Sequence, residues 1–196
     1  MYSLTDWKTR FPRIPQRGPF WCIPASIENM LRYAGVSVLS QEDLILGYCR
    51  KFGQDALLNI VSTAPLQALP ASIQGLSDVQ ILQLAKRCAF RHGNFETFAD
   101  PARQNVAFQN AKLSLDFIGS IKAKGDYFAA VTEAVKANCP VLISVDNGNR
   151  TFHIQAVVEI DADKFTAYDP ALNRLEQYNL ANCVFSNDVL VLKRLP

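Results

Sequence analysis

Five cysteines and two histidines give this chain of 196 residues the side chains that nucleophilic catalysis by a thiol requires. Cys22 stands at the start of a segment with helical spacing, and a helix N-terminus stabilises a thiolate through its unpaired N–H groups and its dipole. Thiol catalysis also needs an imidazole that accepts and returns a proton. His153 is the better placed histidine, because it shares one face of an expected strand with Gln155 while apolar residues occupy the other face.

Two further residues would complete such a site. Asp169 ends the next expected strand, sixteen positions after His153, so a hairpin can set its carboxylate beside the second ring nitrogen of the imidazole. Gln16, six positions before Cys22, offers a side-chain amide to a developing oxyanion beside the Cys22 backbone N–H, and Gly18 allows a tight turn between them. We therefore expect Cys22 as nucleophile, His153 as base, Asp169 as orienting acceptor and Gln16 in the oxyanion hole.

Each of these residues also has an ordinary structural interpretation when taken alone. Cys22 could be a small buried side chain at a helix start, His153 a hydrogen-bonded strand histidine, and Asp169 a turn residue. Gln16 could be a polar loop residue, and Trp21 could either wall the site or pack in the core. The order and spacing of the set as a whole favour catalysis.

The other candidate residues do not form a second site. His92 lies in a polar turn and is expected at the surface. The remaining cysteines have no histidine at comparable spacing, and we expect Cys49 and Cys88 within amphipathic helices, Cys139 at a strand entrance and Cys183 near the last strand. Without a C-x-x-C or HExxH pattern, the sequence predicts no disulfide scaffold, no metal site and no cofactor.

The first half of the chain reads as helical. Residues 1–20 contain several prolines and are expected to be an irregular arm. Helices are predicted from Pro24 to Gly35, from Ser40 to Gly53, and from Ser77, where Gln80 completes a capping box. Residues 54–76 and 89–110 lack clear periodicity and are expected to be loop-rich with short helices.

The second half reads as a sheet. A strand at 112–118 precedes a helix capped by Asp126 that runs to about Ala137, and a β-branched run at 140–145 follows. An Asn-Gly pair at 147–148 predicts a hairpin turn into 152–160, and further strands are expected at 164–169, about 174–178 and 188–193. The order predicts an α+β fold with a mainly antiparallel sheet, in one domain with a helical lobe at about 14–110 and a sheet lobe at about 111–196.

Composition excludes several classes of protein. Twenty basic and eighteen acidic residues give a formal net charge of +2 without long runs of one sign, so nucleic acid is not an expected partner. The N-terminus lacks the apolar run of a secretory signal, and no window reaches about 18 consecutive apolar residues. These features predict a protein without a membrane span, cytoplasmic or delivered by a signal-independent route. They say nothing of its oligomeric state.

The residues of the expected site resemble those of the papain-like cysteine peptidase superfamily. Gln-x5-Cys opening a helix, His at a strand start and Asp in Tyr-Asp-Pro carry the resemblance, and CIPASIENMLRYAGV is most similar to the branch of the bacteriocin-leader (double-glycine) peptidases. The similarity covers roughly 14–35 and 126–170. It implies a papain-like fold with the cysteine helix facing the His and Asp strands across a cleft, and a thiol-dependent hydrolase acting on a peptide or protein.

The chain also departs from that branch. Asp-Cys-Gly-Pro is common around the nucleophile there, whereas this chain has Phe-Trp-Cys-Ile-Pro, so substrate approach on that side is expected to differ. Leader peptidases of that branch usually belong to large membrane transporters, whereas this chain is expected to be free-standing and soluble, so the leader-peptide substrate is not carried over. Cleavage of peptide or isopeptide bonds through an acyl-enzyme is the expected activity. A transglutaminase or deamidase, an acyltransferase of the arylamine type, and a catalytically idle papain-like binding protein remain alternatives.

Overall fold

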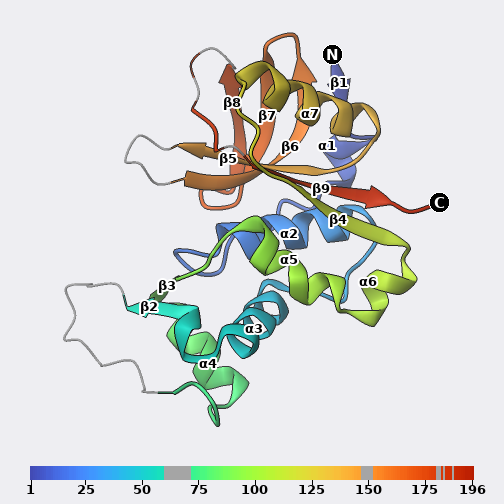
Figure 1. Ribbon diagram of the computed structural model, residues 1–196. Helices are drawn as coiled ribbons and strands as arrows, with labels where there is room; N and C mark the ends of the chain where they lie inside the picture. The colour runs from blue at the N-terminus through green and yellow to red at the C-terminus, as the bar shows by residue number, and fades with distance from the viewer. Residues whose placement is uncertain (60–71, 147–151, 180–181, 183, 187) are drawn as a thin grey trace.

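The computed structural model describes residues 1–59, 72–146, 152–179, 182, 184–186 and 188–196, and the predicted turn at 147–148 lies outside them. The expected α+β order is confirmed: helices come first and an antiparallel sheet follows. Figure 1 shows the sheet in the upper half, α7 (Lys124–Lys136) against its outer side, and the other long helices below it. In the described part of the chain, no helix is long and apolar enough to cross a membrane.

The helices begin and end at the residues that local chemistry favours. α2 spans Cys22–Tyr33 and is followed by Gly35 with φ of 90°. The predicted capping boxes at Ser40 and Ser77 are both present. The other helical elements are α1 (Trp7–Arg10), α3 (Gln41–Phe52), η1 (Gly53–Ala56), α4 (Asp78–Ala85), α5 (Phe95–Arg103) and α6 (Val106–Asn110).

One capping prediction is wrong. α7 begins at Lys124 after Ala123, which makes no side-chain cap, so Asp126 lies inside the first turn. A carboxylate in the first turn still faces the positive end of the helix dipole, which explains why the sequence signal stood so close to the helix start.

The main sheet has seven strands, each antiparallel to its neighbours. Six of them follow the order β4-β9-β5-β6-β7-β8, and the short strand β1 pairs with residues 159–160 of β6. Their bounds are β1 (Tyr2–Ser3), β4 (Leu113–Ile118), β5 (Val141–Asp146), β6 (Phe152–Asp161), β7 (Lys164–Asp169), β8 (Arg174–Asn179) and β9 (Val189–Arg194). Alternation along the strands divides the apolar side chains between two cores. Ile154 and Ala156 face the cluster that contains α2, whereas Val157 and Ala167 face α7.

Two segments are more ordered than the sequence predicts. The N-terminal arm contains β1 and α1, because Leu4, Trp7 and Phe11 bury their side chains in the same core as α2. In the middle region, β2 (Leu57–Asn59) pairs with β3 (Cys88–Phe90), which corrects the expectation that Cys88 lies in a helix. These contacts join residues far apart in sequence, so the local periodicity of the sequence does not predict them.

Candidate active site

Cys22 is the first residue of α2 and is partly buried. Trp21 at the N-cap makes no side-chain cap, so no side chain of that residue competes for the N–H groups that favour an anion at this helix end. The Trp21 indole is fully buried and donates to the carbonyl of Ala85 at 3.2 Å. Trp21 therefore packs in the core and fixes the approach to the cysteine.

The predicted role of Gly18 has a different physical cause from the one expected. No left-handed φ is recorded for Gly18; instead, a Cβ there would lie 2.6–2.8 Å from atoms of the Trp21 ring. The glycine is needed because the indole packs directly against the backbone, rather than because the turn requires a special conformation.

His153 and Asp169 come together across the hairpin of β6 and β7. Nε2 of His153 lies 2.7 Å from Oδ1 of Asp169, and Asp169 is only 3% exposed. The same oxygen accepts backbone N–H groups of Ala171 at 2.8 Å and Leu172 at 3.0 Å. Asp169 is thus both the turn residue that its place before a proline suggests and a partner of the imidazole.

The electrostatics of this pair follow from burial and hydrogen bonding. Burial opposes protonation of His153, but hydrogen bonds to Asp169 and Cys22 and the negative charge of those groups raise the pKa of His153 to about 9. Burial also opposes ionisation of Asp169, yet the hydrogen bonds from His153 and from the two turn N–H groups hold the pKa of its carboxyl below the usual range. The arrangement therefore favours a protonated imidazole of His153 beside an ionised Asp169.

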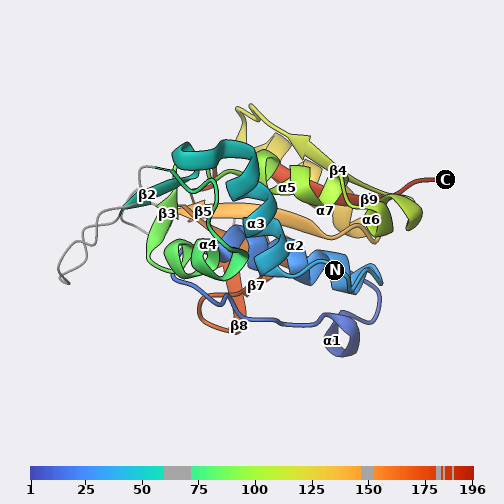
Figure 2. The ribbon, with the colours of Figure 1, turned by 90° about the horizontal axis from the view of Figure 1, so that it is seen from below.

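Gln16 lies beside the β7–β8 turn. Its backbone N–H donates to the carbonyl of Pro170 at 2.9 Å, and Figure 2 shows the segment between α1 and α2 running past β7 and β8. Its side-chain Nε2 donates to the carbonyl of Pro19 at 3.1 Å, while Oε1 is buried and has no hydrogen-bond partner among the described residues. The structure thus brings Gln16 next to Asp169 and into the turn that leads to Cys22.

Gln155 and Tyr178 extend the hydrogen bonding of the His153–Asp169 pair, and the sequence indicated only Gln155. Gln155 is 2% exposed, donates to Oδ2 of Asp169 at 3.2 Å and is hydrogen-bonded to the hydroxyl of Tyr178. Alternation along the strand placed Gln155 on the same side as His153, and their shared partner Asp169 agrees with that placement. No sequence pattern pointed to Tyr178, because its hydroxyl reaches Gln155 only when β8 pairs with β7.

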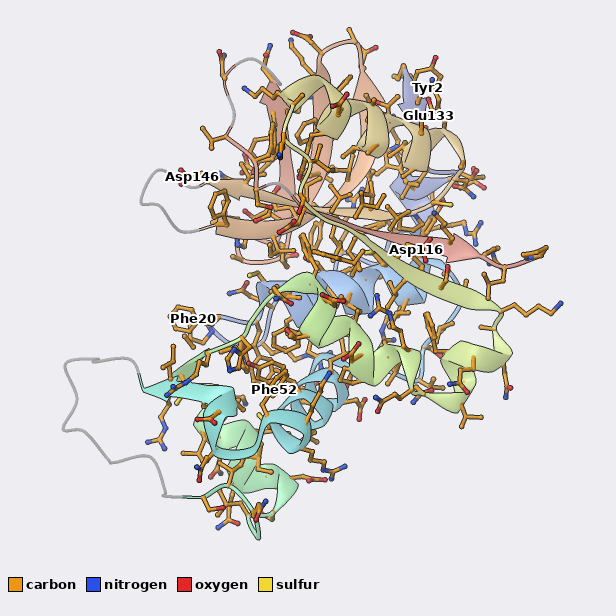
Figure 3. The ribbon with its side chains drawn as sticks, viewed as in Figure 1. Tyr2, Phe20, Phe52, Asp116, Glu133 and Asp146 are labelled. Atoms are coloured by element: carbon orange, nitrogen blue, oxygen red, sulfur yellow. The ribbon has the colours of Figure 1, made fainter. Side chains whose placement is uncertain are left out.

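A cavity of about 250 Å³ opens beside Cys22. Its described lining is largely aromatic and aliphatic, with Asp188 as the one charged side chain in that lining: Phe20, Cys22, Ile23, Ala89, Phe90, Gly93, Asn94, Phe95, Ser144, Phe152, Ile154, Ser186 and Asp188. Figure 3 shows Phe20 at the level where the sheet and the lower helices meet, below Asp146 at the end of β5. Both halves of the molecule therefore contribute to the wall of the cavity.

A larger cavity, of about 610 Å³, lies between the C-terminal ends of α2 and α7 and the strands β4 and β9. Cys139 and Tyr33 are among its lining residues, and no histidine is. Its thiol, Cys139, is not at a helix N-terminus, whereas the smaller cavity is lined by Cys22 at the start of α2.

The other described cysteines occupy different environments. Burial raises the pKa of the Cys49 thiol to about 12, and burial also raises the pKa of Cys88 and of Cys139, which is half-buried. Cys183 lies outside the described residues. His92 is exposed, as expected. Within the described ranges, no group of three or more His, Cys, Asp or Glu side chains is arranged to hold a metal ion.

Comparison with known proteins identifies the fold and the family. The structure resembles the peptidase domain of Streptococcus ComA, a bifunctional ABC transporter involved in a quorum-sensing pathway, with a TM-score of 0.51 and 12% sequence identity over 93% of this chain and 97% of that one. This is a papain-like peptidase fold, so the predicted fold class is confirmed. No curated protein matches the sequence significantly. The model of the Peptidase_C39-like family matches residues 8–187, and the chain belongs to that family.

Proposed function

We propose that this protein is a cysteine peptidase that cleaves peptide or isopeptide bonds through an acyl-enzyme, with Cys22 as nucleophile, His153 as base and acid, Asp169 as orienting acceptor and Gln16 as an oxyanion donor. The observation that carries the proposal is the hydrogen bond between His153 and Asp169, together with the Cys22 thiol at a helix N-terminus beside a cavity, where it contributes to the raised pKa of His153. Membership of a peptidase family supports the same activity.

In the proposed mechanism the Cys22 thiol gives its proton to His153, and the thiolate attacks the carbonyl carbon of the scissile bond. The resulting oxyanion accepts hydrogen bonds from the Cys22 N–H and the Gln16 amide. Collapse breaks the C–N bond, and imidazolium gives its proton to the leaving amine. His153 then removes a proton from water, which attacks the thioester, releases the carboxylic acid product and restores the thiol.

The raised pKa of His153 supports its part in this sequence, because a protonated imidazole is needed when the amine leaves. The depressed pKa of Asp169 keeps that residue ionised, so its carboxylate holds the Nε2 proton and leaves the other ring nitrogen for the cysteine.

The lining of the cavity supports a substrate with an apolar side chain next to the cleaved bond. Phe20, two positions before Cys22, and Phe152, next to His153, line the cavity and are 42% and 46% exposed. Large exposed aromatic side chains at a cavity mouth bind apolar groups more favourably than charged ones.

Two measurements test the proposal. Intact-mass spectrometry after treatment with a thiol-reactive, peptide-like inhibitor, followed by mapping of the labelled peptide, should show Cys22 modified before the other four cysteines. A peptide library rich in aromatic and aliphatic residues should then be cleaved by the protein and left intact by the Cys22→Ala variant.

The outcomes separate the proposal from its rivals. Release of ammonia without backbone cleavage would replace peptidase activity by deamidation or transglutamination at the same cysteine. Labelling of another cysteine first in the folded protein would remove Cys22 as the nucleophile.

A further inference from the structure

Two long polar side chains of α2, Glu28 and Asn29, and one of α3, Gln41, are fully buried in the helical half of the molecule. Burying an amide or a carboxylate is unfavourable unless its hydrogen-bonding groups are satisfied inside the protein. Asn29 and Gln41 hydrogen-bond to the same stretch of backbone, residues 14–17, which we call the Gln16 segment, and Glu28 contacts the side chains of Gln41 and Arg17.

Asn29 holds the start of the Gln16 segment in a two-point contact. Its Oδ1 accepts the backbone N–H of Ile14 at 2.7 Å, and its Nδ2 donates to the carbonyl of the same residue at 2.8 Å. The second proton of Nδ2 is taken by the carbonyl of Ala25, 2.8 Å away in α2. The amide of Asn29 is therefore fully used in fastening this segment to the helix that carries the cysteine.

Gln41 holds the segment on both sides of Gln16. Its Nε2 donates to the carbonyl of Pro15 at 3.0 Å, and its Oε1 accepts the backbone N–H of Arg17 at 3.0 Å. The remaining Nε2 proton goes to Oε2 of Glu28 at 3.1 Å.

Glu28 in turn is neutralised by two arginines. Arg32, one turn further along α2, lies 2.8 Å from Oε1, and Arg17 of the Gln16 segment lies 3.5 Å from it. This buried carboxylate therefore has partners for both oxygens and fixes the amide orientation of Gln41.

Together these contacts leave no backbone N–H of residues 14–17 unpaired. Ile14 donates to Asn29, Gln16 to Pro170 and Arg17 to Gln41, while Pro15 has no N–H to donate. Arg13, just before the segment, has a left-handed φ of 57°, which a non-glycine residue adopts at a cost. The segment is thus held in one conformation from both helices and from the turn after Asp169.

We infer that Asn29 and Gln41 are positioning residues of the active site, which act through Gln16 by holding its backbone at the distance from Cys22 that an oxyanion donor requires. This inference rests on the proposed function, because a catalytic role for Gln16 is part of that function. A donor contributes to catalysis only when it is already in place as charge develops on the oxygen, so two rigid contacts on its flanks have a direct chemical use.

The test compares two reactions of Cys22. Acylation by p-nitrophenyl acetate passes through a tetrahedral oxyanion, forms a thioester and releases p-nitrophenolate, whereas alkylation by iodoacetamide displaces iodide and forms no oxyanion. In Gln41→Met, a change of similar volume, acylation of Cys22 should fall about 10- to 100-fold while alkylation changes less than about threefold. Rates are assigned to Cys22 by peptide mapping, with Cys22→Ala as background.

A matched control lies on the same helix. Tyr48 of α3 is fully buried and its hydroxyl joins two backbone groups, donating to Ala56 at 3.3 Å and accepting from His92 at 3.0 Å. Tyr48→Phe removes a comparable buried contact outside the Gln16 segment, so its ratio of acylation to alkylation should stay that of the unmodified protein. An equal ratio in folded Gln41→Met would overturn the inference.

Coupling provides a second criterion. If Gln41 acts through Gln16, then Gln16→Ala and the double variant Gln16→Ala/Gln41→Met should lose acylation to the same extent. If the double variant instead loses acylation by the product of the two single losses, Gln41 acts on acylation independently of Gln16. Gln41→Asn, which retains an amide for Glu28 but is one methylene shorter, serves where Gln41→Met does not fold, and the same ratio is measured.

Limited trypsin digestion tests the holding of the segment independently of catalysis. Cleavage after Arg13 and Arg17 should be faster in Gln41→Met than in Tyr48→Phe, because the segment has lost two contacts. Equal protection would overturn the inference whatever the reactivity of Cys22. If Cys22 of the unmodified protein is not acylated at all, the proposed function and the catalytic part of the inference fall together, and digestion alone then decides whether the segment is held.

Discussion

At the scale of single residues, the site depends on one imidazole with two partners. Asp169 binds His153 through the same oxygen that accepts two N–H groups of the β7–β8 turn, and Gln155 occupies its second oxygen. Because three groups other than the imidazole hold Asp169, its carboxylate has little freedom to follow the imidazole, so the histidine ring takes its orientation from the sheet.

Replacing Asp169 by asparagine tests this role. The amide keeps the shape but removes the charge that stabilises imidazolium, so turnover should fall on the order of 10² to 10⁴ while the fold survives with a loss of about 1 kcal/mol. Turnover and melting temperature of the variant are compared with those of Asp161→Asn at the exposed end of β6, which should leave both nearly unchanged.

The double variant of Asp169 and Cys22 sharpens the comparison. Because residues that act as a unit are not additive, Asp169→Asn combined with Cys22→Ala should be no less active than Cys22→Ala alone. Near-normal turnover in folded Asp169→Asn, with lowered stability, would leave Asp169 a turn residue only.

The raised pKa of His153 predicts a dependence of stability on pH. The folded pKa, about 9, exceeds the ordinary value of 6.5, so the stabilisation is fully present below about pH 6.5 and is lost as pH rises through about 9. Urea unfolding at pH 6.5 and 9.5 should show a loss about 1–3 kcal/mol larger in the unmodified protein than in His153→Gln. The same loss in both proteins would mean that His153 has no such interactions.

At the scale of elements, the start of α2 is held by close packing rather than by a cap. Trp21 is fully buried, its indole donates to Ala85, and it leaves no room for a side chain at Gly18. The approach to Cys22 is therefore specified by a contact between two residues three positions apart and by a hydrogen bond to α4.

Gly18→Ala tests this packing. Its Cβ would lie within 2.8 Å of the indole, and since that ring cannot move without losing its bond to Ala85, we expect a loss of about 1–3 kcal/mol in the free energy of unfolding. Gly125→Ala is the control: it lies in the first turn of α7 with nothing within 4 Å of the added Cβ and should be neutral or slightly stabilising. Urea denaturation of both variants decides, and equal stabilities would contradict the packing argument.

At the scale of the whole molecule, the middle of the chain shares its core with the cysteine helix. Phe98 of α5 and Ile81 of α4 belong to the same buried cluster as Met30 of α2 and Ala156 of β6. Phe90 and Phe95 also line the cavity beside Cys22. This region thus contributes both to the core and to the lining of the cavity beside Cys22.

We therefore expect residues 54–110 not to fold alone. Isolation of this fragment would expose the apolar surface that α2 and the sheet now cover, which removes much of the free energy that orders its short elements. Thermal unfolding of the fragment followed by circular dichroism should show no cooperative transition, whereas the full chain should unfold in one. A compact fragment with a cooperative melt would establish a separate domain.

The sequence by itself determined most of the long helices and strands and the chemical types of the proposed site. Helix starts at Ser40 and Ser77 follow from capping boxes, and the strands that carry His153 and Asp169 follow from alternation and turn residues, because these signals act over three or four positions. The place of Cys22 at a helix start was predictable for the same reason.

Only the tertiary structure decided which elements meet. The insertion of β9 between β4 and β5, the pairing of β2 with β3, and the contacts of Asn29 and Gln41 with the Gln16 segment join residues that local periodicity does not relate. A buried amide looks like any other amide in the sequence, and its partner is set by how the helices pack. The residues proposed to react could therefore be named from the chain, whereas the contacts of Asn29 and Gln41 could not.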